Sequence, residues 1–94
     1  MVVTEVRLTL LGKPGCHLCD DARDAVAAVV ARLGDAVSVR VEELSILDDP
    51  QLEARYWDEI PVVLINDRVH TVWRVDPDRL ATAITQATVI TQVS

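Results

Sequence analysis

Two cysteines, Cys16 and Cys19, are the residues whose type and spacing point most directly to a chemistry. They form one C-x-x-C segment, directly after Pro14-Gly15 and at the start of a run with helical periodicity. Cysteines three positions apart at a helix start have Cα atoms about 5 to 6 Å apart, which a disulfide can span. The unpaired N–H groups of the helix start also lower the pKa of the first thiol. The pair is therefore predicted to be a redox centre that cycles between dithiol and disulfide.

The positions of the two thiols in the predicted helix assign them different roles. Cys16 lies at or next to the N-cap, where a thiolate is exposed and stabilised, so it is the predicted nucleophile. Cys19 lies one turn later on the apolar stripe, so it is expected to be less accessible and to resolve the mixed disulfide formed on Cys16. A structural disulfide, or two unreactive buried thiols, is the alternative.

Charged side chains near the cysteines bear on the stability of a thiolate. As a cation, His17 would stabilise the Cys16 thiolate and tune its pKa; a solvated side chain without this role is the alternative. Asp20 and Asp21 act in the opposite direction, since nearby negative charge favours the thiol. Lys13 would act on Cys16 through long-range charge or bind a substrate carboxylate, and an exposed loop lysine doing neither is the alternative.

Hydrophobic periodicity along the chain places the cysteines between a strand and a helix. Asn66-Asp67 is expected to form a tight turn, and Asp76-Pro77 to cap the last helix. The segment Ile60–Ile65 is apolar on both faces, so it is the predicted central strand. The predicted elements are strands over 5–11, 37–42, 60–65 and 68–75, and helices over 16–33, 50–57 and from 77 onward.

This βαβαββα order predicts an α/β fold in which helices flank a four-stranded mixed sheet. The chain has 94 residues, of which 50% are apolar, so one domain over residues 1–94 with a single core is expected. Aromatic residues are scarce, and Trp57 and Trp73 are expected to be packing residues.

Composition argues against several classes of protein. A formal charge of −6 without clustered lysine or arginine argues against nucleic-acid binding. No secretory signal and no apolar run of about 20 residues is present, so a cytoplasmic protein without a membrane span is expected. His17 and His70 are the only histidines, and no second C-x-x-C completes a zinc site, so no bound metal is predicted.

The element order, the C-x-x-C after the first strand and the Ile-Pro that opens the third strand together resemble the thioredoxin fold. The length and the segment 11–19, Leu-Gly-Lys-Pro-Gly-Cys-His-Leu-Cys, are similar to the glutaredoxins, in particular to small bacterial glutaredoxin-like proteins. Ile60–Val63 resembles the cis-proline segment of this family. The resemblance implies that Pro61 faces the cysteines and that the backbone of Ile60 binds an extended substrate; an ordinary trans proline is the alternative.

Other parts of the chain depart from the glutaredoxin pattern. Glutaredoxins commonly have Thr or Ser before the proline, where this chain has Ile60. They usually carry a Gly-Gly-x-Asp run that holds glutathione, where residues 71–76 here read Thr-Val-Trp-Arg-Val-Asp. In this region Arg74 and Asp76 would contact a thiol cofactor, or they are a surface charge and a helix cap. The resemblance therefore implies dithiol chemistry without glutathione specificity.

Together these observations predict a monomeric, glutaredoxin-like thiol–disulfide oxidoreductase that reduces protein or low-molecular-weight disulfides. Its cofactor is its own Cys16–Cys19 disulfide, and its reductant is glutathione, another small thiol or a flavoprotein reductase. A non-enzymatic redox-sensing or protein-binding module is one alternative. A carrier of a metal or an iron–sulfur cluster is another.

Overall fold

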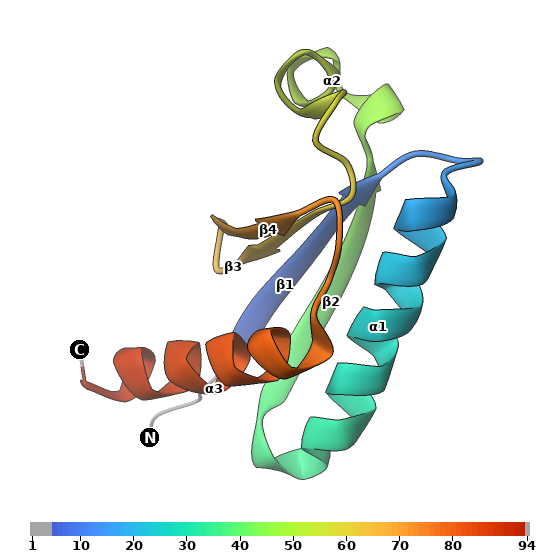
Figure 1. The fold of residues 1–94 in the computed structure, drawn as a ribbon. Coiled ribbons are helices and arrows are strands. Elements are labelled where there is room, and N and C mark those ends of the chain that lie inside the picture. The colour runs from blue at the N-terminus through green and yellow to red at the C-terminus, as the bar shows by residue number, and fades with distance from the viewer. Residues whose placement is uncertain (1–4, 94) are drawn as a thin grey trace.

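The structure, a computed structural model, describes residues 5–93 and the side chains of residues 5–87. It confirms the predicted βαβαββα order (Figure 1). Short 3-10 turns, η1 (Gly34–Ala36) and η2 (Ile46–Asp48), supplement the main elements. The main elements are β1 (Glu5–Gly12), α1 (His17–Leu33), β2 (Ser38–Ser45), α2 (Pro50–Tyr56), β3 (Val62–Ile65), β4 (Arg68–Val72) and α3 (Pro77–Val93).

The four strands form one mixed sheet in the order β2-β1-β3-β4. β1 is parallel to β2 and antiparallel to β3, and β3 and β4 form an antiparallel hairpin. Asn66 and Asp67, with φ angles of 50° and 70°, form the predicted tight turn. Both signs match the turn type that connects twisted hairpin strands. Arg7 N–H donates to Asn66 Oδ1 at 2.9 Å, which ties this turn to β1.

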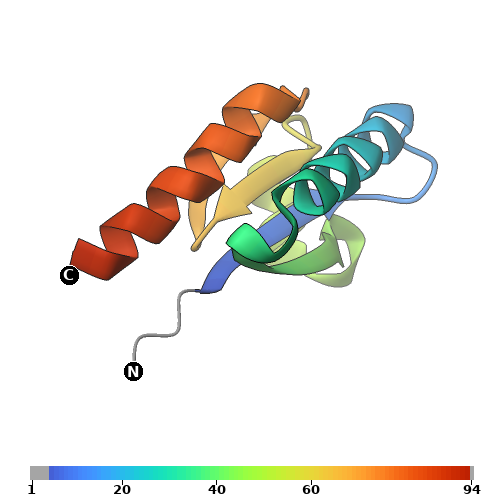
Figure 2. The ribbon, with the colours of Figure 1, turned by 90° about the horizontal axis from the view of Figure 1, so that it is seen from below.

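Helices α1 and α3 lie side by side on one face of the sheet (Figures 1 and 2). The main core fills the space between them and the strands, because alternate residues of β1 and β3 point to this face. Its buried members are Val6, Leu8, Leu10, Ala22, Val26, Val29, Val63, Ile65, Leu80, Ala81 and Ile84.

A second apolar cluster lies at the end of the sheet near α2. Its buried members are Leu11, Cys19, Ile46, Tyr56, Ile60 and Val62. Asp49 caps α2 by accepting a hydrogen bond from Gln51 N–H at 2.9 Å, and Pro50 occupies the first turn. α2 therefore ends with Tyr56 packed into the same cluster as Cys19.

Two strands are shorter than their periodicity predicted. β3 begins at Val62, after the cis peptide bond between Ile60 and Pro61. β4 ends at Val72, because Trp73 has a positive φ and leaves the strand path. α3 extends to Val93, although its side chains from residue 88 lie outside the described set. Among the described residues, no helix has the length and apolar character of a membrane span.

Candidate active site

The cysteines lie where β1 gives way to α1, as their spacing predicted. Cys16 is the N-cap of α1, with φ −100° and ψ 112°, and its Sγ accepts a hydrogen bond from Cys19 N–H at 3.2 Å. The two residues form a disulfide with Cα atoms 5.2 Å apart. Cys16 is partly exposed, whereas Cys19 is only 2% exposed. The site thus presents one accessible sulfur in front of a buried one.

Gly12, the last residue of β1, packs directly against the buried sulfur. A Cβ atom at this position would lie 3.0 Å from Cys19 Sγ and 3.2 Å from Cys19 Cβ. Glycine therefore allows the close approach of the strand to the helix, and a larger residue here would press on Cys19. The sequence did not single out Gly12 as a site residue, and its position at the end of the predicted strand, four residues before Cys16, was the available signal.

The Ile60–Pro61 peptide bond is cis, which agrees with the resemblance to the cis-proline segment. Ile60 packs in the second cluster with Cys19, and Cys16 contacts the same cluster. Pro61 is fully buried. In the part of the chain that the structure describes, neither the N–H nor the C=O of Ile60 makes a hydrogen bond. This main-chain segment near the disulfide is thus free to pair with another strand.

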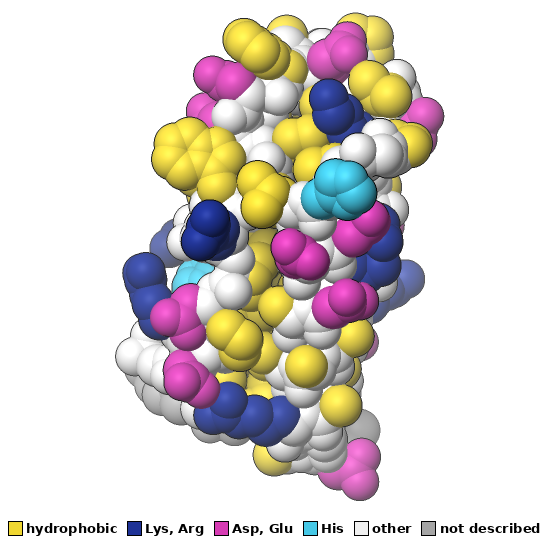
Figure 3. Space-filling model, turned by 45° about the vertical axis from the view of Figure 1, so that its right-hand side comes forward, with side chains coloured by type: hydrophobic (Ala, Val, Ile, Leu, Met, Phe, Trp, Pro, Cys, Tyr) yellow, Lys and Arg dark blue, Asp and Glu magenta, His cyan; other side chains and the backbone are white. Residues whose placement is uncertain are grey.

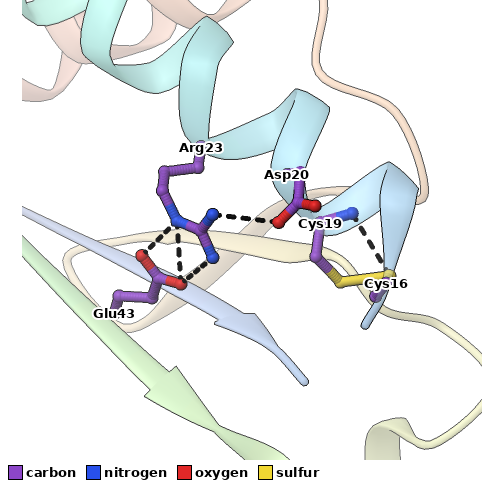
Figure 4. Close-up of a disulfide and its surroundings, with 5 residues drawn as sticks. All are labelled: Cys16, Cys19, Asp20, Arg23 and Glu43. Atoms are coloured by element: carbon purple, nitrogen blue, oxygen red, sulfur yellow. Dashed lines mark hydrogen bonds and ion pairs between the residues drawn. A yellow bond between two sulfur atoms is a disulfide. The ribbon is translucent and has the colours of Figure 1, made fainter. Parts of the chain in front are cut away.

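An ion-pair network connects the helix turn that carries Cys19 to the edge strand β2 (Figure 4). Arg23 donates through Nη1 to Asp20 Oδ1 at 2.9 Å, and through Nε and Nη2 to Glu43 at 2.8 and 2.6 Å. The hydrogen bonds from Arg23 hold the pKa of the Glu43 carboxyl below its usual value. Because Arg23 also pairs with Asp20, the negative charge next to Cys19 is partly offset.

The other predicted tuning and binding side chains lie in solvent. His17 and Lys13 are exposed. Across the described residues, no hydrogen bond or ion pair joins either of them to the cysteines, so their roles stay predictions. Asp76 is a helix cap: its Oδ1 accepts hydrogen bonds from the N–H groups of Asp78 and Arg79 at 3.0 and 3.2 Å.

The prediction that both tryptophans are packing residues is wrong. Trp57 is 65% exposed and Trp73 is 55% exposed. The reason is positional: the neighbours Tyr56 and Val72 pack into the second cluster, which turns the tryptophans outward. Leu18 and Leu47 are likewise exposed neighbours of cluster members. We call these four residues, Leu18, Leu47, Trp57 and Trp73, the apolar rim. Figure 3 shows one face of the molecule, on which exposed hydrophobic side chains are interspersed with charged ones.

Metal ligands do not converge in the described part of the molecule. Among residues 5–93, no group of three or more His, Cys, Asp or Glu side chains is placed to hold a metal ion. The two cysteines are instead bonded to each other.

Comparisons with known proteins agree with this geometry. The model of the family described as Glutaredoxin-like domain (DUF836) matches residues 7–85. An uncharacterised protein of Mycobacterium tuberculosis is 32% identical over 83 residues, which cover 87% of this chain and 86% of that protein. A crystal structure of a structural genomics target from X. campestris has 32% identity and a TM-score of 0.67, covering 84% of this chain and 96% of that one.

The fold extends to more distant proteins. Mitochondrial thioredoxin 3 from Saccharomyces cerevisiae, in its oxidised form, has 11% identity and a TM-score of 0.61, over 89% of this chain and 92% of that one. At this identity the likeness concerns the fold alone. It confirms the predicted thioredoxin-like architecture of the chain.

Proposed function

The chain belongs to the glutaredoxin-like domain family, and from this premise we propose that it is a thiol–disulfide oxidoreductase. The observation that carries the proposal is the asymmetry of the two sulfurs. Cys16 is partly exposed at the N-cap of α1, and Cys19 is buried one turn behind it. A substrate sulfur can therefore reach Cys16, while Cys19 is held within bonding distance of it.

Helix geometry supports Cys16 as the nucleophile. In the reduced protein, the N–H of Cys19 that now donates to Cys16 Sγ at 3.2 Å would stabilise a thiolate on that sulfur. The partial positive charge at the start of the 17-residue helix α1 acts in the same direction. Both effects lower the pKa of Cys16 relative to a free thiol and raise the fraction of thiolate at neutral pH.

The reaction proceeds by two thiol–disulfide exchanges. The Cys16 thiolate attacks one sulfur of a substrate disulfide; an S–S bond to Cys16 forms, the substrate S–S bond breaks, and one substrate thiolate leaves. The Cys19 thiolate then attacks Cys16 Sγ and displaces the second substrate thiolate, which yields the disulfide seen in the structure. Two electrons have passed to the substrate, and a small thiol or a flavoprotein reductase would restore the dithiol.

The segment Ile60–Pro61 supports the binding of an extended substrate. The backbone N–H and C=O of Ile60 are unpaired among the described residues, and Ile60 packs in the same cluster as the disulfide. A polypeptide that pairs with these groups would run past Cys16 as an added strand does. Pairing with the main chain of Ile60 would therefore align the substrate along the site, and Cys16 would react with its disulfide.

Serine variants of the two cysteines test the proposal. Cys16→Ser is expected to reduce turnover of a disulfide substrate to the uncatalysed rate, because no other cysteine is accessible in this chain. In the absence of an external thiol, pre-reduced Cys19→Ser is expected to attack once and to stop, so that a mixed disulfide on Cys16 accumulates. Turnover is measured with dithiothreitol as electron donor, and the trapped adduct is measured separately by mass spectrometry after dithiothreitol has been removed.

The two variants also serve as controls for each other, since each replaces one sulfur by oxygen at the same site. Circular dichroism would establish that both remain folded. If Cys16→Ser kept the activity, or if the adduct formed on Cys19 instead, the assignment of the nucleophile would be wrong. If the wild type and both variants all failed to reduce any disulfide, the oxidoreductase proposal itself would fail.

A further inference from the structure

Trp73, the residue that follows β4, has a backbone conformation that is unusual for a bulky side chain. Its φ angle is 68°, in the left-handed region that favours glycine. Arg74 N–H donates to Val72 C=O at 2.8 Å and closes a three-residue γ-turn around Trp73. The form of this turn with positive φ is rare and strained. Such a conformation persists only where its surroundings hold it, and these positions gather at functional sites.

Two hydrogen bonds hold Trp73 in place beside the cis-proline segment. Its N–H donates to Pro61 C=O at 2.8 Å, and its indole Nε1–H donates to Asp58 C=O at 2.9 Å. The side chain is nevertheless 55% exposed. The bonds therefore fix a large apolar surface in solvent instead of burying it. Such a fixed aromatic side chain loses little conformational entropy when a partner binds, which is the property of a good interface anchor.

The chain around Trp73 connects this surface to the disulfide. Val72, directly before it, packs in the second cluster, which also contains Cys19 and contacts Cys16. The C=O of Pro61 accepts the hydrogen bond from the N–H of Trp73, and Pro61 directly follows Ile60, whose main chain has no hydrogen-bond partner in the described part of the chain. A polypeptide paired with Ile60 would thus lie close to both Trp73 and Cys16.

The charged residues next to the apolar rim disfavour the binding of small anionic disulfides. Acidic residues outnumber basic ones close to the rim, so a doubly charged anion is repelled. Within two residues of the four rim members the chain has five acids (Asp20, Asp48, Asp49, Asp58 and Glu59) and two arginines (Arg55 and Arg74). Arg23 offsets the charge of Asp20, and the other four acids still outnumber the two arginines. An apolar and uncharged peptide segment avoids this repulsion and gains contact with the rim.

We infer that Trp73 determines the substrate specificity of the Cys16–Cys19 site, an inference that rests on the proposed function. The tryptophan selects polypeptide disulfides whose cysteine has apolar neighbours over small anionic disulfides such as glutathione disulfide. An apolar side chain next to the substrate cysteine packs on the indole while the cysteine sulfur meets Cys16. The exchange reaction is the one described under the proposed function. Trp73 takes no part in it and affects only which disulfide binds.

A comparison of three substrates tests this inference. Two synthetic peptide disulfides of equal length carry a cysteine flanked by leucines or by glutamates, and glutathione disulfide is the third; dithiothreitol donates the electrons. We expect the wild type to have its highest kcat/KM for the leucine peptide. Trp73→Gly should lower that value about tenfold, the effect of losing one interface anchor, and leave glutathione disulfide unchanged or faster. Glycine accepts the positive φ, so the turn is retained.

Matched variants separate specificity from general damage. Trp73→Phe keeps an aromatic surface and should retain most of the preference for the leucine peptide. Val69→Ala removes an apolar side chain that is 49% exposed elsewhere on β4, and it should leave all three substrates unchanged. If the glycine variant does not fold, Trp73→Asn replaces it, because asparagine also tolerates the left-handed region.

The outcomes distinguish this inference from the proposed function. A wild type that prefers glutathione disulfide, or a Trp73→Gly variant that slows all three substrates by one factor, would overturn the specificity role and leave the oxidoreductase standing. A wild type that reduces none of them would remove the oxidoreductase and this inference with it. A selective loss of the leucine peptide in Trp73→Gly supports both.

Discussion

Replacement of Gly12 by alanine adds one methyl group against the buried sulfur of the active site. The new Cβ would lie 3.0 Å from Cys19 Sγ and 3.2 Å from Cys19 Cβ, where ordinary contacts begin at 3.4 Å. Cys19 is 2% exposed and is backed by the second cluster, so it can yield only by a shift of several tenths of an ångström. Overpacking of this kind costs about 1 to 3 kcal/mol.

The cost falls unequally on the two redox states. In the oxidised protein Cys19 Sγ is bonded to Cys16, whereas in the reduced protein it can rotate about its Cα–Cβ bond. Rotation relieves the contact with Cys19 Sγ but not the contact with Cys19 Cβ, so the added methyl group strains the disulfide form more than the reduced form and makes it a stronger oxidant. For a two-electron couple about 30 mV corresponds to 1.4 kcal/mol, so the strain confined to the disulfide, at most about 3 kcal/mol, raises the reduction potential by up to about 65 mV.

The assay is a redox titration against defined thiol buffers, with urea unfolding of both redox forms. Gly34→Ala is the matched control: Gly34 has φ 54°, and no atom lies within 4 Å of an added Cβ. It should cost about 1 to 3 kcal/mol through the backbone in both forms, because Gly34 combines φ 54° with ψ −131°, and it should leave the potential unchanged. Two results would contradict this prediction: a shift in reduction potential for Gly12→Ala no larger than that for Gly34→Ala, or unchanged stability of both redox forms of Gly12→Ala. Either would mean that the contact with Cys19 does not strain the disulfide form.

Two further predictions concern pH. Arg23 lowers the pKa of Glu43 below 4.5, so this pair stabilises the fold above the unfolded-state pKa and its contribution is lost as pH falls through the folded-state pKa. Glu43→Gln should therefore unfold at lower urea concentration than the wild type at pH 7 but equally at strongly acidic pH, and high salt should narrow the difference; a constant difference at every pH would contradict this. Burial, followed by the charge of Arg79, lowers the pKa of His70 below 6.5, so the unfolded chain takes up the proton first and wild-type stability falls as pH drops below that value. The urea midpoint of His70→Gln should therefore fall less than that of the wild type between neutral and mildly acidic pH. If the urea midpoints of both proteins fell equally with pH, this prediction would be refuted.

Local patterns were sufficient to predict the elements and the reactive pair. The alternation in 5–11 and the helical stripe from Cys16 to Leu33 each reflect a single element with one face in the core, which is why they appear in the sequence. The N-cap position of Cys16 follows from the end of one pattern and the start of the next. The hairpin turn at Asn66-Asp67 was also predicted correctly, because both residue types tolerate positive φ.

Contacts between distant segments could not be predicted in this way. The periodicity of 68–75 favoured a longer strand, but the hydrogen bonds of Trp73 to Pro61 and Asp58 override it and end β4 at Val72. Trp57 and Trp73 were expected to be packing residues. Their exposure depends on whether their neighbours Tyr56 and Val72 pack into the second cluster, and that cluster assembles from six separate parts of the chain.

The sequence by itself determined that this chain has a C-x-x-C at a helix start in a βαβαββα domain, because spacing and periodicity act within a few residues. Only the tertiary structure decided what surrounds the pair. It brought Gly12 against Cys19, left the main chain of Ile60 without a hydrogen-bond partner among the described residues, and turned Trp73 to solvent. These features arise where β1, α1 and the segments around β3 and β4 meet, and packing between such distant segments leaves no periodic trace in the sequence.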